Sequence, residues 1–122
     1  MASETNLVKK IQIAFSRLGA RVFRNNVGML EDKRGMKVRY GLCTGSSDLI
    51  GWTPVVITQA MVGSRVAVFT SVEAKSDKGK LRPEQMAWLT VIEAAGGIAM
   101  LVRSESEATI MLSKMLKAFK GG

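Results

Sequence analysis

The chain has 122 residues, the size of a single domain, and its 47% hydrophobic and 23% charged residues exclude a disordered chain. The chain has no histidine, which excludes a Ser-His-Asp triad, and its single cysteine (Cys43) excludes an internal disulfide. Together these two facts also exclude a zinc site made of Cys and His ligands. No apolar run approaches the about 20 residues of a membrane span, which excludes a membrane helix. Its 18 Lys and Arg residues against 10 acids give a net charge of +8, which indicates a polyanionic partner (nucleic acid or an anionic membrane surface) or serves solubility alone.

Hydrophobic periodicity and turn residues divide the chain into seven elements. The predicted order is a helix at 4–18, strands at 20–24, 48–52 and 65–75, a helix at 83–95, a strand at 98–102 and a helix from 104 to 119. Residues 27–47 are rich in glycine and charge and predict a long loop or a pair of short strands, and residues 55–58 could continue the strand at 48–52 past Pro54. This αβββαβα order predicts an α/β fold, with a mixed central sheet flanked by helices, and one domain over residues 1–122.

The strand at 65–75 ends in a carboxylate and an ammonium group. Glu73 and Lys75 are two residues apart on a strand, so their side chains project from the same face. A strand-end ion pair, which is common and contributes little stability, would account for this pair by itself.

Asp48 adds a second carboxylate, because it opens a strand expected to neighbour the strand of Glu73. Two carboxylates brought together at low dielectric repel unless a cation lies between them. A divalent ion would resolve that conflict, coordinate a phosphate and acidify a bound water, while Lys75 could orient this water or neutralise the phosphate. Since the chain lacks histidine, the ligands would be oxygens, which favours Mg²⁺ or Mn²⁺. Phosphodiester hydrolysis uses all three residue types.

The ordered set Gly45-Ser-Ser-Asp48, Glu73-Ala-Lys75, and then Gln85 and Trp88 on the next helix, resembles the PD-(D/E)XK nuclease superfamily. Within it, the chain is most similar to the VRR-NUC domain in its small stand-alone form, from Glu4 to about Arg103. The resemblance implies a restriction-endonuclease-like core. Two departures stand out: Ser47 rather than proline precedes Asp48, and the gap of 25 residues (73 − 48) requires residues 53–64 to form a hairpin excursion.

The resemblance also implies roles for individual residues. Asp48 and Glu73 would ligate Mg²⁺, which Mn²⁺ could replace, the backbone carbonyl of Ala74 would complete the coordination, and Lys75 would be the catalytic lysine. Glu4 matches the acidic residue on the first helix of the family, and Gln85 the glutamine on the helix after the lysine. The alternatives are helix-dipole stabilisation for Glu4 and an exposed first-turn position for Gln85.

The implied function is a metal-dependent endonuclease that cuts branched DNA, such as Holliday junctions, as a homodimer. Its candidate DNA contacts, which could equally be a solvated charged surface, are Arg34, Lys37, Arg39, Lys78, Lys80 and Arg82. Arg24 and Asn26 could touch phosphate or organise the site, although Asn pairs usually make turns. Rival functions are a non-catalytic nucleic-acid-binding module and a single-strand or exonucleolytic nuclease. We expect a cytoplasmic location (that of the host if the chain is phage-encoded) and no membrane association.

Overall fold

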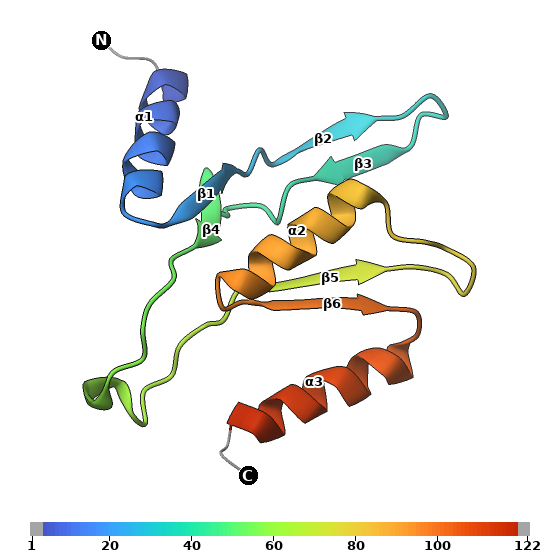
Figure 1. The fold of residues 1–122 in the computed structure, drawn as a ribbon. Helices are drawn as coiled ribbons and strands as arrows, with labels where there is room; N and C mark the ends of the chain where they lie inside the picture. The colour runs from blue at the N-terminus through green and yellow to red at the C-terminus, as the bar shows by residue number, and fades with distance from the viewer. Residues whose placement is uncertain (1–3, 120–122) are drawn as a thin grey trace. The chain divides into compact units, whose positions relative to one another are not determined.

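The computed structural model describes residues 4–119, which divide into two compact units, one up to Val62 and one from Gly63 onward. Each unit is described by itself. Both units combine helices with small sheets of strands, which confirms the predicted α/β class (Figure 1). None of the helices in this described part has the length and hydropathy of a membrane-spanning segment.

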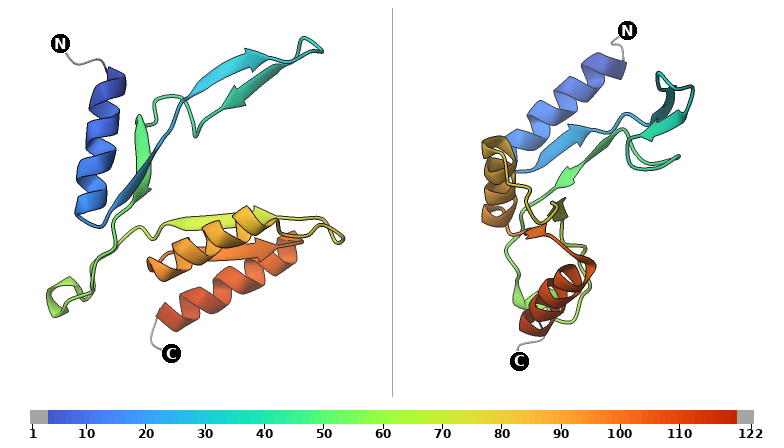
Figure 2. Two further views of the ribbon diagram at one scale, coloured as in Figure 1. Left: turned by 45° about the horizontal axis from the view of Figure 1, so that its top comes forward. Right: turned by 90° about the vertical axis from the view of Figure 1, so that its right-hand side faces the viewer.

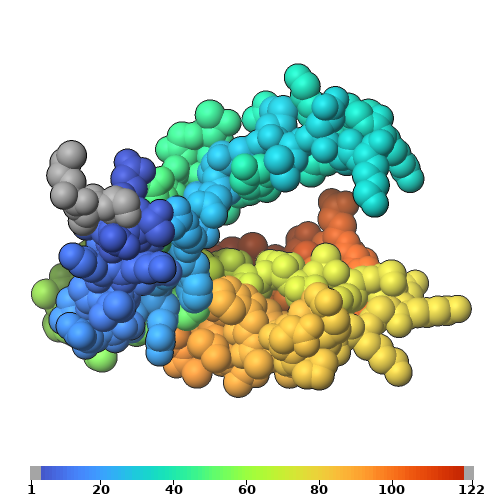
Figure 3. All heavy atoms as spheres, turned by 90° about the horizontal axis from the view of Figure 1, so that it is seen from above, coloured from blue at the N-terminus to red at the C-terminus, as the bar shows by residue number. Residues whose placement is uncertain are grey.

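The first unit is built from one helix and two antiparallel strand pairs. Its elements are α1 (Glu4–Arg17), β1 (Arg21–Arg24), β2 (Gly28–Glu31), β3 (Lys37–Tyr40), β4 (Leu49–Trp52) and the 3₁₀ helix η1 (Gln59–Met61). β1 pairs with β4, and α1 packs beside β1, where Gln12 Nε2 donates a hydrogen bond of 3.2 Å to the carbonyl of Val22. β2 pairs with β3 in a hairpin that extends from the rest of its unit (Figure 3), so residues 27–47 form the pair of short strands.

The second unit is a parallel strand pair covered by two helices. Its elements are β5 (Thr70–Ala74), α2 (Pro83–Ala94), β6 (Ile98–Val102) and α3 (Glu105–Phe119). β5 and β6 pair in register from Thr70 opposite Ile98 to Ala74 opposite Val102. The core lies on one face, where Ile98, Met100 and Val102 of β6 pack against Ala108, Met111 and Met115 of α3.

α2 covers the opposite face of this strand pair (Figure 2). Glu73 lies beside Leu101 in the register, and side chains alternate along a strand, so Glu73 projects away from the core face of Met100. Its neighbour across that face is Gln85 of α2. Pro83 begins α2 and Gly96-Gly97 follow it, as the sequence predicts. The alternation of β5 therefore directs its odd-numbered residues toward the first turns of α2.

Three expectations about the strands are wrong. The strand predicted at 65–75 contains only residues 70–74, because β6 begins at Ile98, whose N–H donates to the Phe69 carbonyl and starts the ladder there. Residues 53–64 contain η1 and no strand, so neither a continuation at 55–58 nor a hairpin forms. Within residues 4–119 the strands pair as β1 with β4, β2 with β3 and β5 with β6.

Candidate active site

The Glu73 carboxylate in the second unit receives two cationic or polar donors at one oxygen. Gln85 Nε2 donates a hydrogen bond of 2.9 Å to Glu73 Oε1, and Lys75 Nζ lies 3.5 Å from the same atom. The side chains of Lys75 and Glu73 are only 20% and 31% exposed. Within residues 4–119, Glu73 Oε2 receives no donor. One oxygen therefore orients the carboxylate, and the other remains available to a ligand.

The Gln85 side chain is held at both ends of its amide. Its Oε1 accepts a hydrogen bond of 3.0 Å from the backbone N–H of Arg82, which precedes α2, and its Nε2 donates to Glu73. The carbonyl end thus caps a free N–H at the start of the helix. Because the cap uses the oxygen, the nitrogen is left to face Glu73, and the helix start sets the position of the carboxylate.

A second hydrogen bond ties α2 to β5 one step further back along the strand. Trp88 Nε1 donates a hydrogen bond of 2.9 Å to Ser71 Oγ. Ser71 and Glu73 are two apart on a strand, and Gln85 and Trp88 are three apart on a helix, so each pair presents one face. The Gln85–Glu73 and Trp88–Ser71 hydrogen bonds therefore hold α2 against β5 at two points.

The backbone carbonyl of Ala74 is directed away from β6. Ile98 N–H donates to the Phe69 carbonyl at 2.8 Å, and Lys75 N–H donates to the Val102 carbonyl at 3.0 Å. In a parallel ladder alternate residues turn their backbone groups to the partner strand, so the odd-numbered residues of β5 face β6 and Ala74 faces the other edge. This carbonyl is therefore free of the ladder, as a metal ligand requires.

The donor set fits a hard divalent ion. Glu73 Oε2 and the Ala74 carbonyl are both oxygen donors, which Mg²⁺ prefers. No group of three or more Asp, Glu, Cys or His side chains gathers in the part of the chain that the structure describes. An ion would accordingly be held by few carboxylates together with backbone and water oxygens.

In the first unit, Asp48 lies exposed between a glycine-rich loop and β4. Asn25 holds this loop: its N–H donates to the Asp48 carbonyl at 2.8 Å, and its Nδ2 donates to Ser46 Oγ at 2.7 Å and to the Ser47 carbonyl at 2.9 Å. Its Oδ1 accepts from the N–H of Leu42 at 3.0 Å. One side chain thus joins both ends of the segment 42–48.

The sequence indicated only that the Asn25-Asn26 pair could organise the site or make a turn, and it did not predict these bonds of Asn25 to the loop before Asp48. Gly41 begins the same loop at φ +83°, where a Cβ would collide with the carbonyl of Asn26. A glycine is required at this position, because its conformation and its close backbone approach both exclude a side chain. The only available signal was an Asn pair at a strand end together with a loop rich in Gly and Ser.

A model of the VRR-NUC domain matches residues 6–106 of the chain. The chain belongs to the VRR-NUC family. No curated protein and no solved structure matches it. Membership makes the chain a nuclease of the PD-(D/E)XK type, a hydrolase whose substrate is DNA, and such nucleases generally use divalent metal ions.

The remaining predicted residues of this VRR-NUC chain belong to the first unit, or to the segment between β5 and α2 in the second. Glu4 stands exposed in the first turn of α1 and has no hydrogen bond or ion pair within residues 4–119. Arg24 Nε donates to Asn26 Oδ1 at 3.1 Å, so these two side chains bind each other. Arg82 pairs at 3.4 Å with Glu84, and both side chains are 68% exposed. The other cations lie on the β2–β3 hairpin (Arg34, Lys37 and Arg39) and in the loop after β5 (Lys78 and Lys80).

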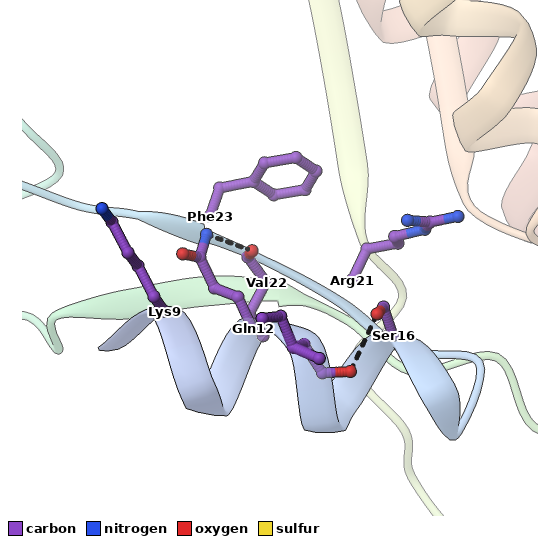
Figure 4. Close-up of a pocket in the computed structure, with 7 residues that line it drawn as sticks. Lys9, Gln12, Ser16, Arg21, Val22 and Phe23 are labelled. Atoms are coloured by element: carbon purple, nitrogen blue, oxygen red, sulfur yellow. Dashed lines mark hydrogen bonds between the residues drawn. The ribbon is translucent and has the colours of Figure 1, made fainter. Parts of the chain in front are cut away.

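A hollow of about 460 Å³ in the first unit lies between α1 and β1 (Figure 4). Lys9, Gln12, Ser16 and Arg21 are among its lining residues, and two hydrogen bonds visible there join Gln12 to the Val22 carbonyl and Ser16 to the Ile13 carbonyl. None of the predicted site residues lines it. This hollow is therefore separate from the residues predicted to carry the chemistry of this VRR-NUC chain.

Proposed function

We propose that the chain is a magnesium-dependent, structure-specific endonuclease that cuts branched DNA. The observation that carries the proposal is the Glu73 carboxylate, whose Oε1 is held by Gln85 and Lys75 while Oε2 has no protein donor in the described chain. A structural ion pair alone would not need a half-buried glutamine fixed at both ends of its amide. A carboxylate oriented through one oxygen is prepared to bind an ion through the other.

Asp48 and Glu73 are the proposed carboxylate ligands, with the Ala74 carbonyl as a third oxygen. Mg²⁺ bound there would supply Lewis-acid stabilisation of the phosphate and a more acidic water, and Mn²⁺ could replace it. Lys75 keeps its ammonium beside Glu73, where it would orient a water or neutralise a phosphate oxygen. Gln85 holds Glu73, and Glu4 is the proposed additional acid of the site. Since the family match spans parts of both units, we infer that residues 1–122 form one domain.

The DNA backbone is proposed to bind the two basic segments. The β2–β3 hairpin carries Arg39 and Lys37 on one face, opposite Met29 and Glu31. The loop after β5 begins directly at Lys75, so phosphate contacts from Lys78 and Lys80 would lie close to the catalytic lysine in the chain. Arg34, Arg82, Arg24 and Asn26 complete the proposed DNA contacts.

We further propose a homodimer, because paired cuts across a four-way junction need two sites related by a two-fold axis. α3 supports this proposal. Ala108, Met111 and Met115 pack on β6, whereas Leu112, Leu116 and Phe119 remain 41%, 50% and 65% exposed. These three recur at positions i, i+4 and i+7, so they form an apolar stripe beside the packed one.

One assay tests the function. Four-way junction, flap, duplex and single-stranded DNA are incubated with the protein in Mg²⁺, Mn²⁺ or excess EDTA, and the mass in solution is measured by light scattering. We expect cleavage only with a divalent ion, fastest on the junction, and a dimer mass. Asp48→Asn and Glu73→Gln should abolish cutting and leave DNA binding intact. Cleavage that persists in EDTA, or in either variant, would remove the metal mechanism, and a monomer that cuts duplex as fast as junction would remove the junction specificity.

A further inference from the structure

Arg103, the residue after β6, binds the loop that follows Lys75. Its NH1 nitrogen lies 2.6 Å from the Ser76 carbonyl, 2.7 Å from the Gly79 carbonyl and 3.5 Å from the Asp77 carbonyl. The side chain is half-buried, and it reaches 24 to 27 residues back along the chain. A charged donor thus holds the carbonyls at both ends of the turn 76–79.

This turn lies against the stem of Lys75. Gly79 N–H donates to the Ser76 carbonyl at 3.0 Å and closes the turn. A Cβ built on Gly79 would lie 3.3 Å from Lys75 Cβ and 3.4 Å from Lys75 Cδ, so the backbone of Gly79 covers the aliphatic part of the lysine. This cover helps to explain why only 20% of the Lys75 side chain is exposed.

We propose that Arg103 is a positioning residue for Lys75 and acts through the turn 76–79. A lysine stem has four rotatable bonds, and an uncovered stem would let the ammonium move among many positions. With Gly79 facing Cβ and Cδ of the lysine, the turn limits the stem to conformations such as the one seen, in which Nζ lies 3.5 Å from Glu73 Oε1. The consequence for turnover rests on the proposed function, whereas the consequence for the mobility of Lys75 does not.

The turn itself explains the need for a charged anchor. Ser76, Asp77 and Gly79 are loop residues whose carbonyls have no sheet partner to hold them. Arg103 is fixed at the end of β6, because Val102 before it lies in the ladder opposite Ala74. Hydrogen bonds from a charged group are stronger than those between neutral groups, so the guanidinium joins the turn firmly to the strand pair.

The test compares Arg103→Met with Arg65→Met, which removes the same charge at an exposed site outside the proposed DNA contacts. The first readout is acetylation of Lys75 by acetic anhydride in the metal-free protein, followed by peptide mass spectrometry with Lys9 as the internal reference. We expect Lys75 to react faster in Arg103→Met and at the wild-type rate in Arg65→Met. The second readout is cleavage with Mg²⁺: Arg103→Met should lose turnover by about 10- to 100-fold, as expected when a reacting group is misplaced, whereas Arg65→Met should keep the wild-type turnover.

Two more variants keep the test decisive if Arg103→Met does not fold. Arg103→Lys retains a charged donor and should restore part of the turnover and of the Lys75 protection. Gly79→Ala keeps Arg103 but pushes on the Lys75 stem, so it should lower turnover without changing the charge. Unchanged acetylation of Lys75 in folded Arg103→Met would overturn the proposal, as would an equal effect in Arg65→Met. If Arg103→Met does not fold, unchanged turnover in Gly79→Ala would overturn it. If the wild type cuts no DNA at all, the proposed function fails, and the acetylation rates still decide the role of Arg103.

Discussion

Gln85→Ala should destabilise the protein through two hydrogen bonds at once. The variant loses the cap on the Arg82 N–H, which is worth about 1 kcal/mol. It also loses the donor to the Glu73 carboxylate, and hydrogen bonds to charged groups are worth about 1.5–3 kcal/mol. That second value must be reduced, because Glu73 is 31% exposed and keeps Lys75. We expect a total loss of about 2 kcal/mol in the free energy of unfolding, the sum of the cap and a reduced charged bond.

Urea denaturation followed by circular dichroism measures this loss. With a slope of about 1–3 kcal/mol per molar urea, the midpoint should fall by about 1 M. Glu84→Ala is the matched control, because it changes the neighbouring first-turn residue and removes only an exposed ion pair with Arg82, worth at most about 1 kcal/mol. If Gln85→Ala unfolds at the midpoint of Glu84→Ala, the amide of Gln85 does not hold Glu73 and the helix start as described.

Three further predictions address the lysine, the loop and the DNA surface. Lys75→Ala should lower turnover by about two to three orders of magnitude, as removal of one preorganised electrostatic group does, and calorimetry should show an unchanged metal affinity. Normal turnover together with lost metal binding would show that the role proposed for Lys75 is wrong. Asn25→Ala should raise the Mg²⁺ concentration for half-maximal cleavage, because it releases the loop before Asp48. Asn26→Ala loses only the hydrogen bond from Arg24 and should leave this concentration unchanged. Equal Mg²⁺ requirements in the two variants would contradict the prediction. The logarithm of the affinity for duplex DNA should fall with the logarithm of the salt concentration by about 0.9 per phosphate contact. The triple alanine variant of Arg34, Lys37 and Arg39 should therefore flatten this slope by about 3 × 0.9 or roughly 2.7. An unchanged slope would show that the DNA does not bind the β2–β3 hairpin.

The parts of this structure that the sequence predicted are those set by local chemistry. Pro83 and Gly96-Gly97 bound α2 whatever the rest of the chain does, and the period of two on a strand is enough to put Glu73 and Lys75 on one face. Membership of the VRR-NUC family also followed from an ordered set of residues and is confirmed.

The parts that could not be predicted depend on partners distant in sequence. Residues 65–69 are as apolar as a central strand, but a strand needs a neighbour, and β6 provides one only from Ile98 onward. The bonds of Asn25 reach 17 to 23 residues along the chain, and most of those of Asn25 and Arg103 end on backbone carbonyls. Any residue type offers such a carbonyl, so no sequence pattern records the contact.

The pleat of β5 makes the spacing of three consecutive residues as important as their identity. Glu73, Ala74 and Lys75 supply a side chain, a backbone carbonyl and a second side chain, each assigned its direction by alternation along one strand. A one-residue insertion between Thr70 and Glu73 would turn both side chains toward α3 and the carbonyl of Ala74 toward β6. A two-residue insertion would restore every direction but move the group about 6.6 Å along the strand, away from Gln85. We therefore expect insertions and deletions within β5 to abolish the site even where substitutions are tolerated. Insertions and deletions should be tolerated instead in loops such as 53–64.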